Sequence, residues 1–380
     1  MFSKIIAITL LGCAITLARA DTTHWNEFAI PGKGRMSVSV IYPEKNSGIL
    51  VAAQDSADDR QTILSYDKRG LLNWSMHPSD GSGDLANTTL SDAGVLGDAR
   101  SGYLACMHHT ASKENPDNFS TLIVLNKTGA ITESKKIVLD KNGYKKYSRI
   151  KKCKNNKDGY LLFGIAAADT PSGPDGGPLH HYWLRQTDIK FIASNDFVIP
   201  SDLGYIANIV EVITSAESTL VVGTSTTQTE LSLIGADGKL IARRLLAGDG
   251  KLIHHGDSIE IASVTGHKIS RYKLDFKLNM TSENSISIPE DALVVAVFSN
   301  SSSGLDIFTT KNIDDETRLY LTNLSSQTRF GRSTLIKKWH GQVFFSPVQK
   351  KDNHGNYLLS KTELVLDQPP RIVNSLVKFK

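Results

Sequence analysis

The feature that most constrains the fold is a recurring pair of β-strand patterns with no amphipathic helix between the copies. Each unit opens with a short apolar run after a glycine or small polar residue, and a second apolar run past a loop ends in a tight turn. Copies begin at Gly48, Gly102, Gly159 and Ser218, and further ones near Ser258, Gly304 and Gly341. The period of roughly 40 to 55 residues is typical of four-stranded propeller blades, and strands without intervening helices argue against a βαβ fold.

A ring of blades gives these strands a place to bury their apolar faces. A single four-stranded sheet exposes two apolar faces, and packing each against a neighbour in a closed ring buries both. We therefore predict an all-β chain folded as a β-propeller of about seven four-stranded blades, with six or eight as alternatives. Residues 25–30 precede the first innermost strand, predicted at 36–42, and should pair with residues 372–379 to close the ring. The same pattern permits β-sandwich domains, which are the competing architecture.

Two turns carry a resemblance to a known class of repeats. Asp67-Lys68-Arg69-Gly70 and Asn126-Lys127-Thr128-Gly129 each follow one strand and precede another, and Trp74 follows the first copy. This pattern resembles the outer hairpin of quinoprotein-like repeats in bacterial exported propellers. The match covers about the first four units, and most copies lack the tryptophan that locks neighbouring blades. The resemblance implies the fold and gives no reason to expect a quinone cofactor.

The N-terminus has the features of a cleavable bacterial signal peptide. Lys4 is followed by an apolar run from Ile5 to Leu17 and then by Ala18-Arg19-Ala20, which is the order that signal peptidases recognise. We predict cleavage after Ala20, with residues 21–380 forming one propeller domain in the periplasm or the medium. An alternative takes Leu10-Leu11-Gly12-Cys13 as a lipoprotein box that anchors the chain through a lipid on Cys13. No later stretch is long and apolar enough to be expected to cross a bilayer.

Charge and cysteine content narrow the choice of partners. Loss of Lys4 and Arg19, with no acid in the leader, lowers the formal charge from +4 to about +2, so a nucleic-acid partner is not expected. Cys106 and Cys153 remain in the mature chain. An even count in an oxidising compartment favours a disulfide, and two buried free thiols are the alternative.

Propeller topology predicts which loops share a face, because strands alternate direction within a blade. Loops between second and third strands lie on the same face as the connections between blades, and the other hairpins lie on the opposite face. On the first face, acidic side chains are predicted to bind a cation or a basic partner. The candidate binding residues are Asp55, Asp58, Asp59, Asp169, Asp175, Asp314 and Asp315. Ordinary solvated loop residues are the alternative interpretation.

Adjacent histidines suggest a second kind of site. Neutral imidazoles are good ligands for transition metals, and two histidine pairs flank the second-to-third loops of neighbouring units. The candidate ligands for a divalent metal are His108, His109, His180 and His181. Since adjacent residues on a strand point to opposite sides, surface or packed histidines are the simpler interpretation.

No catalytic motif stands out, so the sequence alone leaves the function open. A nucleophile elbow, a zinc-protease helix, a phosphate-binding loop and a dinucleotide fingerprint are all missing from the sequence. The favoured hypothesis is an exported, monomeric, non-catalytic propeller that binds a protein or peptide as a scaffold, assembly factor or inhibitor. The alternatives are a secreted hydrolase or lyase acting on a glycan or peptide at the acidic loop face, and a metal- or small-ligand-binding protein. No cofactor is predicted apart from that metal.

Overall fold

The structure is a computed structural model of the 380-residue chain. It describes residues 26–44, 48–58, 61–78, 88–89, 95–98, 102–109, 119–139, 144, 149–156, 159–171, 178–215, 217–256, 258–300, 304–324, 330, 332–352, 354–365 and 371–379. The predicted signal peptide and the alternative lipid-anchor residue Cys13 lie outside these ranges. Within them, no helix has the length and apolar character that crossing a bilayer requires.

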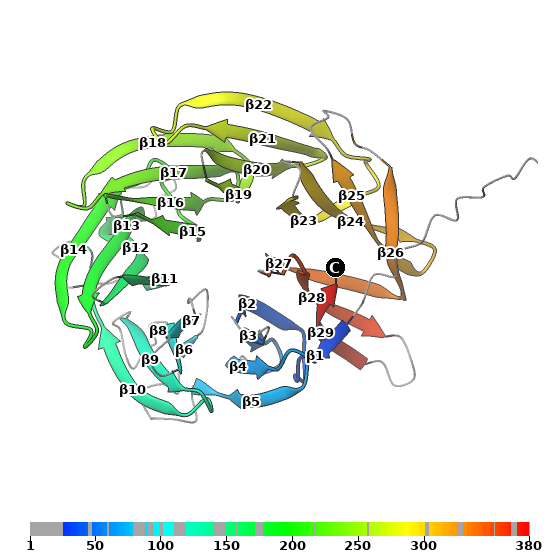
Figure 1. Ribbon diagram of the computed structural model, residues 1–380, viewed down its shortest axis with the longest axis horizontal. Coiled ribbons are helices and arrows are strands. Elements are labelled where there is room, and N and C mark those ends of the chain that lie inside the picture. The colour runs from blue at the N-terminus through cyan, green and yellow to red at the C-terminus, as the bar shows by residue number, and fades with distance from the viewer. Residues whose placement is uncertain are drawn as a thin grey trace, which may run out of the picture.

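Seven antiparallel sheets are arranged as blades around a central axis, as predicted (Figure 1). Chain order gives the blade order, and the first strand of blades 1 and 3 to 7 is the innermost. In blade 2 the innermost position is divided between β6 and β7, which both pair with β8. The second strands begin at Ile49, Gly102, Gly159, Ser218, Ile259, Leu305 and Tyr357.

The strand bounds follow the blade order. Blade 1 contains β2 (Met36–Pro43), β3 (Ile49–Asp55), β4 (Gln61–Tyr66) and β5 (Leu72–Met76), and blade 2 contains β6 (Thr88–Thr89), β7 (Val95–Asp98), β8 (Gly102–His109), β9 (Phe119–Asn126) and β10 (Ile131–Ile137). Blade 3 contains β11 (Arg149–Asn156), β12 (Gly159–Pro171), β13 (Pro178–Asp188) and β14 (Ala193–Pro200), and blade 4 contains β15 (Asn208–Thr214), β16 (Ser218–Thr224), β17 (Gln228–Gly235) and β18 (Leu240–Ala247). Blade 5 contains β19 (Asp249–His255), β20 (Ile259–Thr265), β21 (Lys268–Leu274) and β22 (Met280–Ser287), and blade 6 contains β23 (Leu293–Ser299), β24 (Leu305–Ile313), β25 (Glu316–Leu324) and β26 (Ser333–His340). Blade 7 contains β27 (Gln342–Lys351), β28 (Tyr357–Val365), β29 (Arg371–Phe379) and β1 (Asn26–Ala29).

The hydrophobic core lies between the blades. Second strands such as β3 are apolar and buried along almost their whole length, whereas outer strands such as β10 have mostly exposed side chains. Each apolar cluster is shared by adjacent sheets; one of them joins Phe28 and Leu376 of blade 7 to Val51 and Leu64 of blade 1. Burying both faces of every blade is what a ring achieves and a single sheet cannot.

The ring closes through the N-terminal strand, which confirms the predicted pairing of the two chain ends. Strand β1 pairs antiparallel with β29, from Asn26 opposite Lys378 to Ala29 opposite Ser375 (Figure 1). A fully buried lysine of β28 reinforces this edge, because the Lys361 Nζ lies 2.6 Å from a carboxylate oxygen of Glu27 in β1. Backbone pairing and an ion pair with a buried lysine thus replace the covalent link that the first and last blades lack.

The outer hairpins of several blades share one hydrogen-bonding device. The Oδ1 of Asp67 accepts the backbone N–H groups of Arg69 (2.8 Å) and Leu71 (2.9 Å). The side chain of Asn126 does the same in blade 2, as do those of Asp188 and Asp275 in blades 3 and 5. The fourth residue of each hairpin has a positive φ, in the left-handed region. A short polar side chain at the first position therefore fixes the turn.

Candidate functional site

A cavity of about 660 Å³ lies where the innermost strands converge on the propeller axis. Its lining comes mainly from the first strands of blades 1, 3, 4, 5, 6 and 7. Uncharged hydrogen-bonding side chains make up much of the wall, among them Gln54, Asn208 and Gln349. The charged lining residues are Lys152, Glu211, Asp249, Lys251, Lys350 and Lys351. Four lysines against two acids give this central cavity an excess of positive charge.

The strand pleat explains why these charges face the axis. Asp249 and Lys251 are two residues apart on β19, so their side chains lie on the same side of the strand. Burial lowers the pKa of Lys251 below its usual value, and the carboxylate of Asp249 opposes that shift only in part. An ammonium group held in a partly dehydrated wall attracts an anion more strongly than one on the open surface.

Glu211 makes the contacts that span the cavity. Its Oε1 lies 3.2 Å from the Nζ of Lys154 on β11, and its Oε2 lies 3.6 Å from the Nζ of Lys350 on β27. Blades 4 and 7, which supply Glu211 and Lys350, are three positions apart in the ring. Burial alone raises the pKa of Glu211, but the two ammonium groups and the N–H of Val212 outweigh it, and the net pKa lies below the usual value. Glu211 is therefore ionised at neutral pH.

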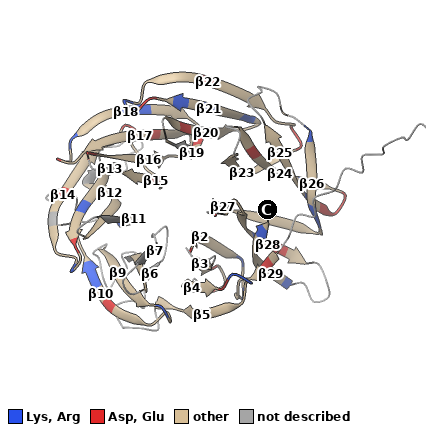
Figure 2. Ribbon diagram, in the orientation of Figure 1, with Lys and Arg blue, Asp and Glu red and all other residues tan. Residues whose placement is uncertain are grey.

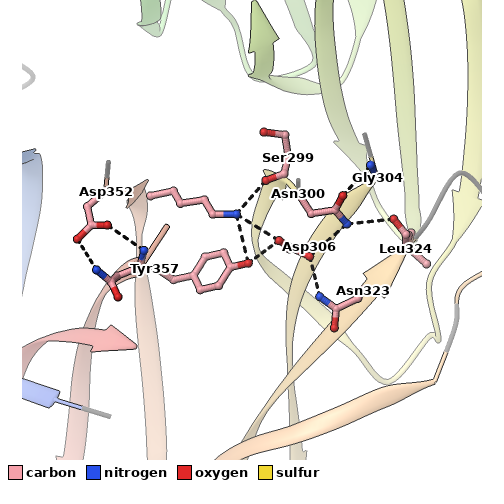
Figure 3. A network of polar contacts seen from close by, with 10 residues as sticks. Ser299, Asn300, Gly304, Asp306, Asn323, Leu324, Asp352 and Tyr357 are labelled. Atoms are coloured by element: carbon pink, nitrogen blue, oxygen red, sulfur yellow. Dashed lines mark hydrogen bonds and ion pairs between the residues drawn. The ribbon is translucent and has the colours of Figure 1, made fainter. Parts of the chain in front are cut away.

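A second charged group, Asp306 of blade 6, contacts Lys351 and Tyr357 of blade 7 (Figure 3). The residue is buried, and its Oδ2 accepts hydrogen bonds from the Tyr357 hydroxyl and from the Nζ of Lys351 (3.4 Å). The Oδ1 accepts from the amide groups of Asn323 (2.7 Å) and Asn300 (3.4 Å). Burial and the bond to Asp306 raise the pKa of Tyr357, which keeps its hydroxyl protonated as a donor. This buried carboxylate is fully partnered and joins the two blades.

Lys351 connects this network to the central cavity. Its Nζ donates to the backbone oxygen of Ser299 at 3.1 Å, and the side chain lines both the central cavity and an open cavity of about 650 Å³ beside Tyr357. Lys350 and Lys351 are adjacent on β27 and contact different acids. The two adjacent lysines therefore pair with different carboxylates, Lys350 with Glu211 and Lys351 with Asp306.

The predicted acidic residues of blade 1 serve the local fold. Asp55 is buried, and its carboxylate accepts the backbone N–H groups of Lys33 (2.6 Å), Gly34 (2.8 Å) and Ala57 (2.9 Å). Burial alone would raise the pKa of Asp55. The three N–H groups and the Lys33 ammonium lower it by more, so the net pKa is below the usual value. Asp58 is more exposed and lies 3.9 Å from the Nζ of Lys33. Neither residue lines the central cavity.

The other predicted acidic residues do not gather with those of blade 1. Asp314 and Asp315 are in the loop between β24 and β25, beside a separate cavity of about 440 Å³. The neighbouring Glu316 is paired with Arg318 at 2.9 Å. Asp59 and Asp175 lie outside the described residues, as does the side chain of Asp169, whose backbone is in β12. Acidic and basic positions are interspersed around the described ring rather than collected in one sector (Figure 2).

The predicted histidine ligands sit on neighbouring blades. The Nδ1 of His180 on β13 accepts the backbone N–H of Ile206 at 3.0 Å, and the ring of His181 lies edge-on to Tyr144. Burial lowers the pKa of both imidazoles. The side chains of His108 and His109 on β8 lie outside what the structure describes, so the four-histidine site stays a prediction. Among the described residues, no three metal-binding side chains are grouped together.

Cys106 and Cys153 are paired across a blade boundary. Cys106 is on the second strand of blade 2 and Cys153 on the first strand of blade 3, and the structure joins them as a disulfide with a Cα–Cα distance of 6.7 Å. Both residues are buried in the cluster that these blades share. The link adds a covalent tie to a boundary that is also held by side-chain packing and by hydrogen bonds such as that from the Ile150 N–H to the Ser120 hydroxyl.

None of the predicted site residues that the structure describes lines the central cavity, and its charged residues were not predicted. A pattern that could identify some of them is a strand with charges at alternate positions placed directly before a largely buried strand. Asp249 and Lys251, ahead of Ile259–Thr265, show it most clearly. The strand that carries these two charges is the innermost of its blade and has an unpaired edge at the propeller axis, where polar side chains are in contact with water.

Comparison with known proteins adds information about the fold only. No protein-family model matches the chain, and no curated protein matches it. A prolyl endopeptidase structure is similar with a TM-score of 0.50 at 14% identity, over 90% of this chain and 50% of that one. An acylaminoacyl peptidase from Pyrococcus horikoshii has a TM-score of 0.44 at 14% identity, over 89% of this chain and 52% of that one. A putative 6-phosphogluconolactonase from Bacteroides fragilis has a TM-score of 0.41 at 11% identity, over 94% and 95%.

The identity and coverage values of these matches bear on the fold alone. The chain spans about half the length of the peptidase chains that it matches. At identities this low the likeness to the prolyl endopeptidase shows a shared propeller and nothing about activity, because one fold serves many unrelated functions. The function has to be argued from the cavity itself.

Proposed function

We propose that the protein is an exported binding protein whose central cavity receives an acidic peptide segment of a partner. The observation that carries the proposal is the excess of lysine over acidic side chains lining a cavity of about 660 Å³. Cavities of roughly 300 to 1,000 Å³ are typical of sites that enclose a ligand group. Lysine ammonium groups attract carboxylates and raise the rate at which an anionic partner finds the site.

The uncharged part of the wall favours a peptide as the source of the carboxylate. Gln54, Asn208 and Gln349 carry side-chain amides, which both donate and accept hydrogen bonds. A peptide backbone presents the matching groups, one N–H and one C=O for each residue. The predicted leader supports the exported part of the proposal, since the partner would then be another protein of the envelope or the medium.

Direct binding tests the proposal. We expect rhodamine-labelled hexaglutamate to bind the mature protein, with hexaserine and hexalysine binding at least about tenfold more weakly. Lys251→Met should weaken hexaglutamate binding about tenfold, because the substitution keeps the apolar stem and removes one charge from the partly dehydrated wall. Exposed Lys277, in the outer hairpin of blade 5, provides the matched control. Lys277→Met should change the Kd by less than about twofold.

Two outcomes would overturn the proposal. Equal binding of all three peptides would show that the cavity charge does not select the ligand. Binding of oligogalacturonate in preference to hexaglutamate would overturn the assignment of a peptide. Capture from an envelope extract with the wild type, compared with Lys251→Met, then identifies the physiological partner by its dependence on the cavity.

A further inference from the structure

The carboxylate of Glu211 is held between two lysines at the wall of the central cavity. It is held by one ammonium group from blade 3 and one from blade 7, with Nζ–O distances of 3.2 and 3.6 Å, and it also accepts the N–H of Val212 at 3.1 Å. Two cations and one backbone donor around a single carboxylate are the contacts that an acidic side chain of a bound peptide would use. The protein therefore already contains an occupant for this part of its cavity.

We propose that Glu211 is an internal competitor, and that an acidic ligand binds by displacing it from Lys154 and Lys350. The inference rests on the proposed function and specifies the place in the cavity where the ligand carboxylate binds. It makes the Lys154–Lys350 pair the ligand subsite and gives Glu211 the task of occupying that subsite when no ligand is present.

The exposure of the two lysines and Glu211 means that such an exchange costs little free energy. The side chains of Lys154, Glu211 and Lys350 are 38%, 25% and 45% exposed, so water reaches all three. Ion pairs exposed to water contribute little to stability, and replacing one carboxylate by another preserves most of what they contribute. Glu211 and Lys350 both line the central cavity, so an incoming acidic group can reach the Lys350 ammonium group from there.

The neighbouring lysine shows what a fixed pair looks like. Lys351 contacts Asp306, whose side chain is 2% exposed and accepts three further hydrogen bonds (Figure 3). Separating that pair would leave a buried carboxylate without its cation, which is strongly unfavourable. Of the two adjacent lysines on β27, only Lys350 is therefore placed to exchange its partner.

Internal competition lowers the apparent affinity for the ligand by the fraction of time that the subsite is free. If Glu211 occupies the lysines in about nine molecules of ten, removal of its charge tightens binding about tenfold. Glu217 is exposed in the turn that follows β15, outside the cavity, so Glu217→Gln changes the net charge equally without touching the subsite. This variant is the matched control for Glu211→Gln.

The experiment titrates rhodamine-labelled hexaglutamate into the full mature chain and its variants. We expect Glu211→Gln to lower the Kd about tenfold and Glu217→Gln to leave it within about twofold. Adding Lys350→Met to the Glu211→Gln variant should abolish the gain. Glu211→Ala should give the same gain as Glu211→Gln, and circular dichroism melts check that each variant is folded.

The outcomes separate this inference from the proposed function. An unchanged or weaker affinity in both folded Glu211 variants, with wild-type binding that still depends on Lys251, would overturn the competition and leave the peptide-binding function standing. A gain of equal size in Glu217→Gln would also overturn it, because net charge alone would then explain the effect. Failure of the wild type and both Glu211 variants to bind hexaglutamate would overturn both proposals.

Discussion

Two blade boundaries contain the same kind of outer hairpin but differ in which blade supplies the aromatic ring that packs there. They are the boundary between blades 1 and 2 and the boundary between blades 2 and 3. At the first, the indole of Trp74 from blade 1 covers Gly129 of the blade 2 hairpin, and its Nε1 donates to the oxygen of Lys127 at 3.0 Å. At the second, the hairpin supplies the ring itself, because Phe191 occupies the left-handed position with φ 60° and is 4% exposed. The glycine of the first hairpin leaves space for a ring from the neighbouring blade, whereas the second hairpin contributes its own ring to the core.

The two arrangements are complementary in volume. An added Cβ on Gly129 would come within 2.4 Å of the Trp74 ring, so this position has no space for a side chain. Phe191 stacks on Tyr160 with ring centroids 5.2 Å apart and belongs to the core cluster that blade 2 shares. A left-handed conformation costs a non-glycine residue about 1–2 kcal/mol, which the buried ring offsets. The backbone geometry of the two hairpins is thus the same, whereas the ring that packs there comes from the neighbouring blade in one and from the hairpin itself in the other.

The largest effect should come from removing the ring that the hairpin supplies. We expect Phe191→Ala to lower the free energy of unfolding by about 3–5 kcal/mol, because it leaves a cavity and keeps the strained backbone. Phe191→Gly should cost about 1 kcal/mol less than Phe191→Ala, since glycine relieves that strain. Urea-induced unfolding followed by circular dichroism measures both changes.

The adjacent residue provides the control for this prediction. Ile192 is 60% exposed, so Ile192→Ala should change the stability by no more than about 0.5 kcal/mol. If alanine proves less costly than glycine at position 191, the left-handed residue is not strained and the comparison between the two boundaries fails.

A somewhat smaller effect is expected from adding an atom at the other boundary. Gly129→Ala should lower the free energy of unfolding by about 3 kcal/mol, from a left-handed alanine and from overpacking against Trp74. Gly204 has φ +66° with nothing within 4 Å of an added Cβ, so Gly204→Ala should cost only the backbone part, about 1–2 kcal/mol. In a Trp74→Ala background, the cost of Gly129→Ala should fall to that of Gly204→Ala. Equal costs for the two glycines in the wild type would show that the indole does not limit the space.

The contrast also shows how far the sequence could lead. Glycine marks a left-handed residue, so the hairpins ending in Gly70 and Gly129 were recognisable, together with Trp74. Phe191 and Leu278 occupy the same conformation without that mark, which is why the repeat pattern faded after the early units. The ring closure was predictable because both end segments are strand-like and must pair with something. In the last blade, the second strand begins at Tyr357, whereas the unit near Gly341 marks the innermost strand.

The candidate site was harder to predict than the fold. Charges in loops were the natural candidates, but Asp55 is used internally, and Asp314 and Asp315 lie on another blade. Lys350 and Glu211 come from strands of different blades, and only the closed ring brings them together. A sequence shows which residues share a strand, whereas which strands meet across an axis depends on the number and order of the blades.

The smallest expected effect separates two hairpins, one beginning with a residue that titrates and the other with a residue that does not. Hydrogen bonds from backbone N–H groups, first that of Leu71, lower the pKa of Asp67, whereas Asn126 makes the same bonds without a charge. Because the folded pKa lies below the unfolded value of about 3.9, the contribution of Asp67 is present above that value and is lost as the pH falls through the folded pKa. The difference in Tm between wild type and Asp67→Asn should therefore be present at about pH 6 and shrink progressively as the pH falls below about 3.9. Asn126→Asp should introduce the same pH dependence at the boundary of blades 1 and 2, and a Tm difference that stays constant with pH in either variant would contradict this account of the hairpin.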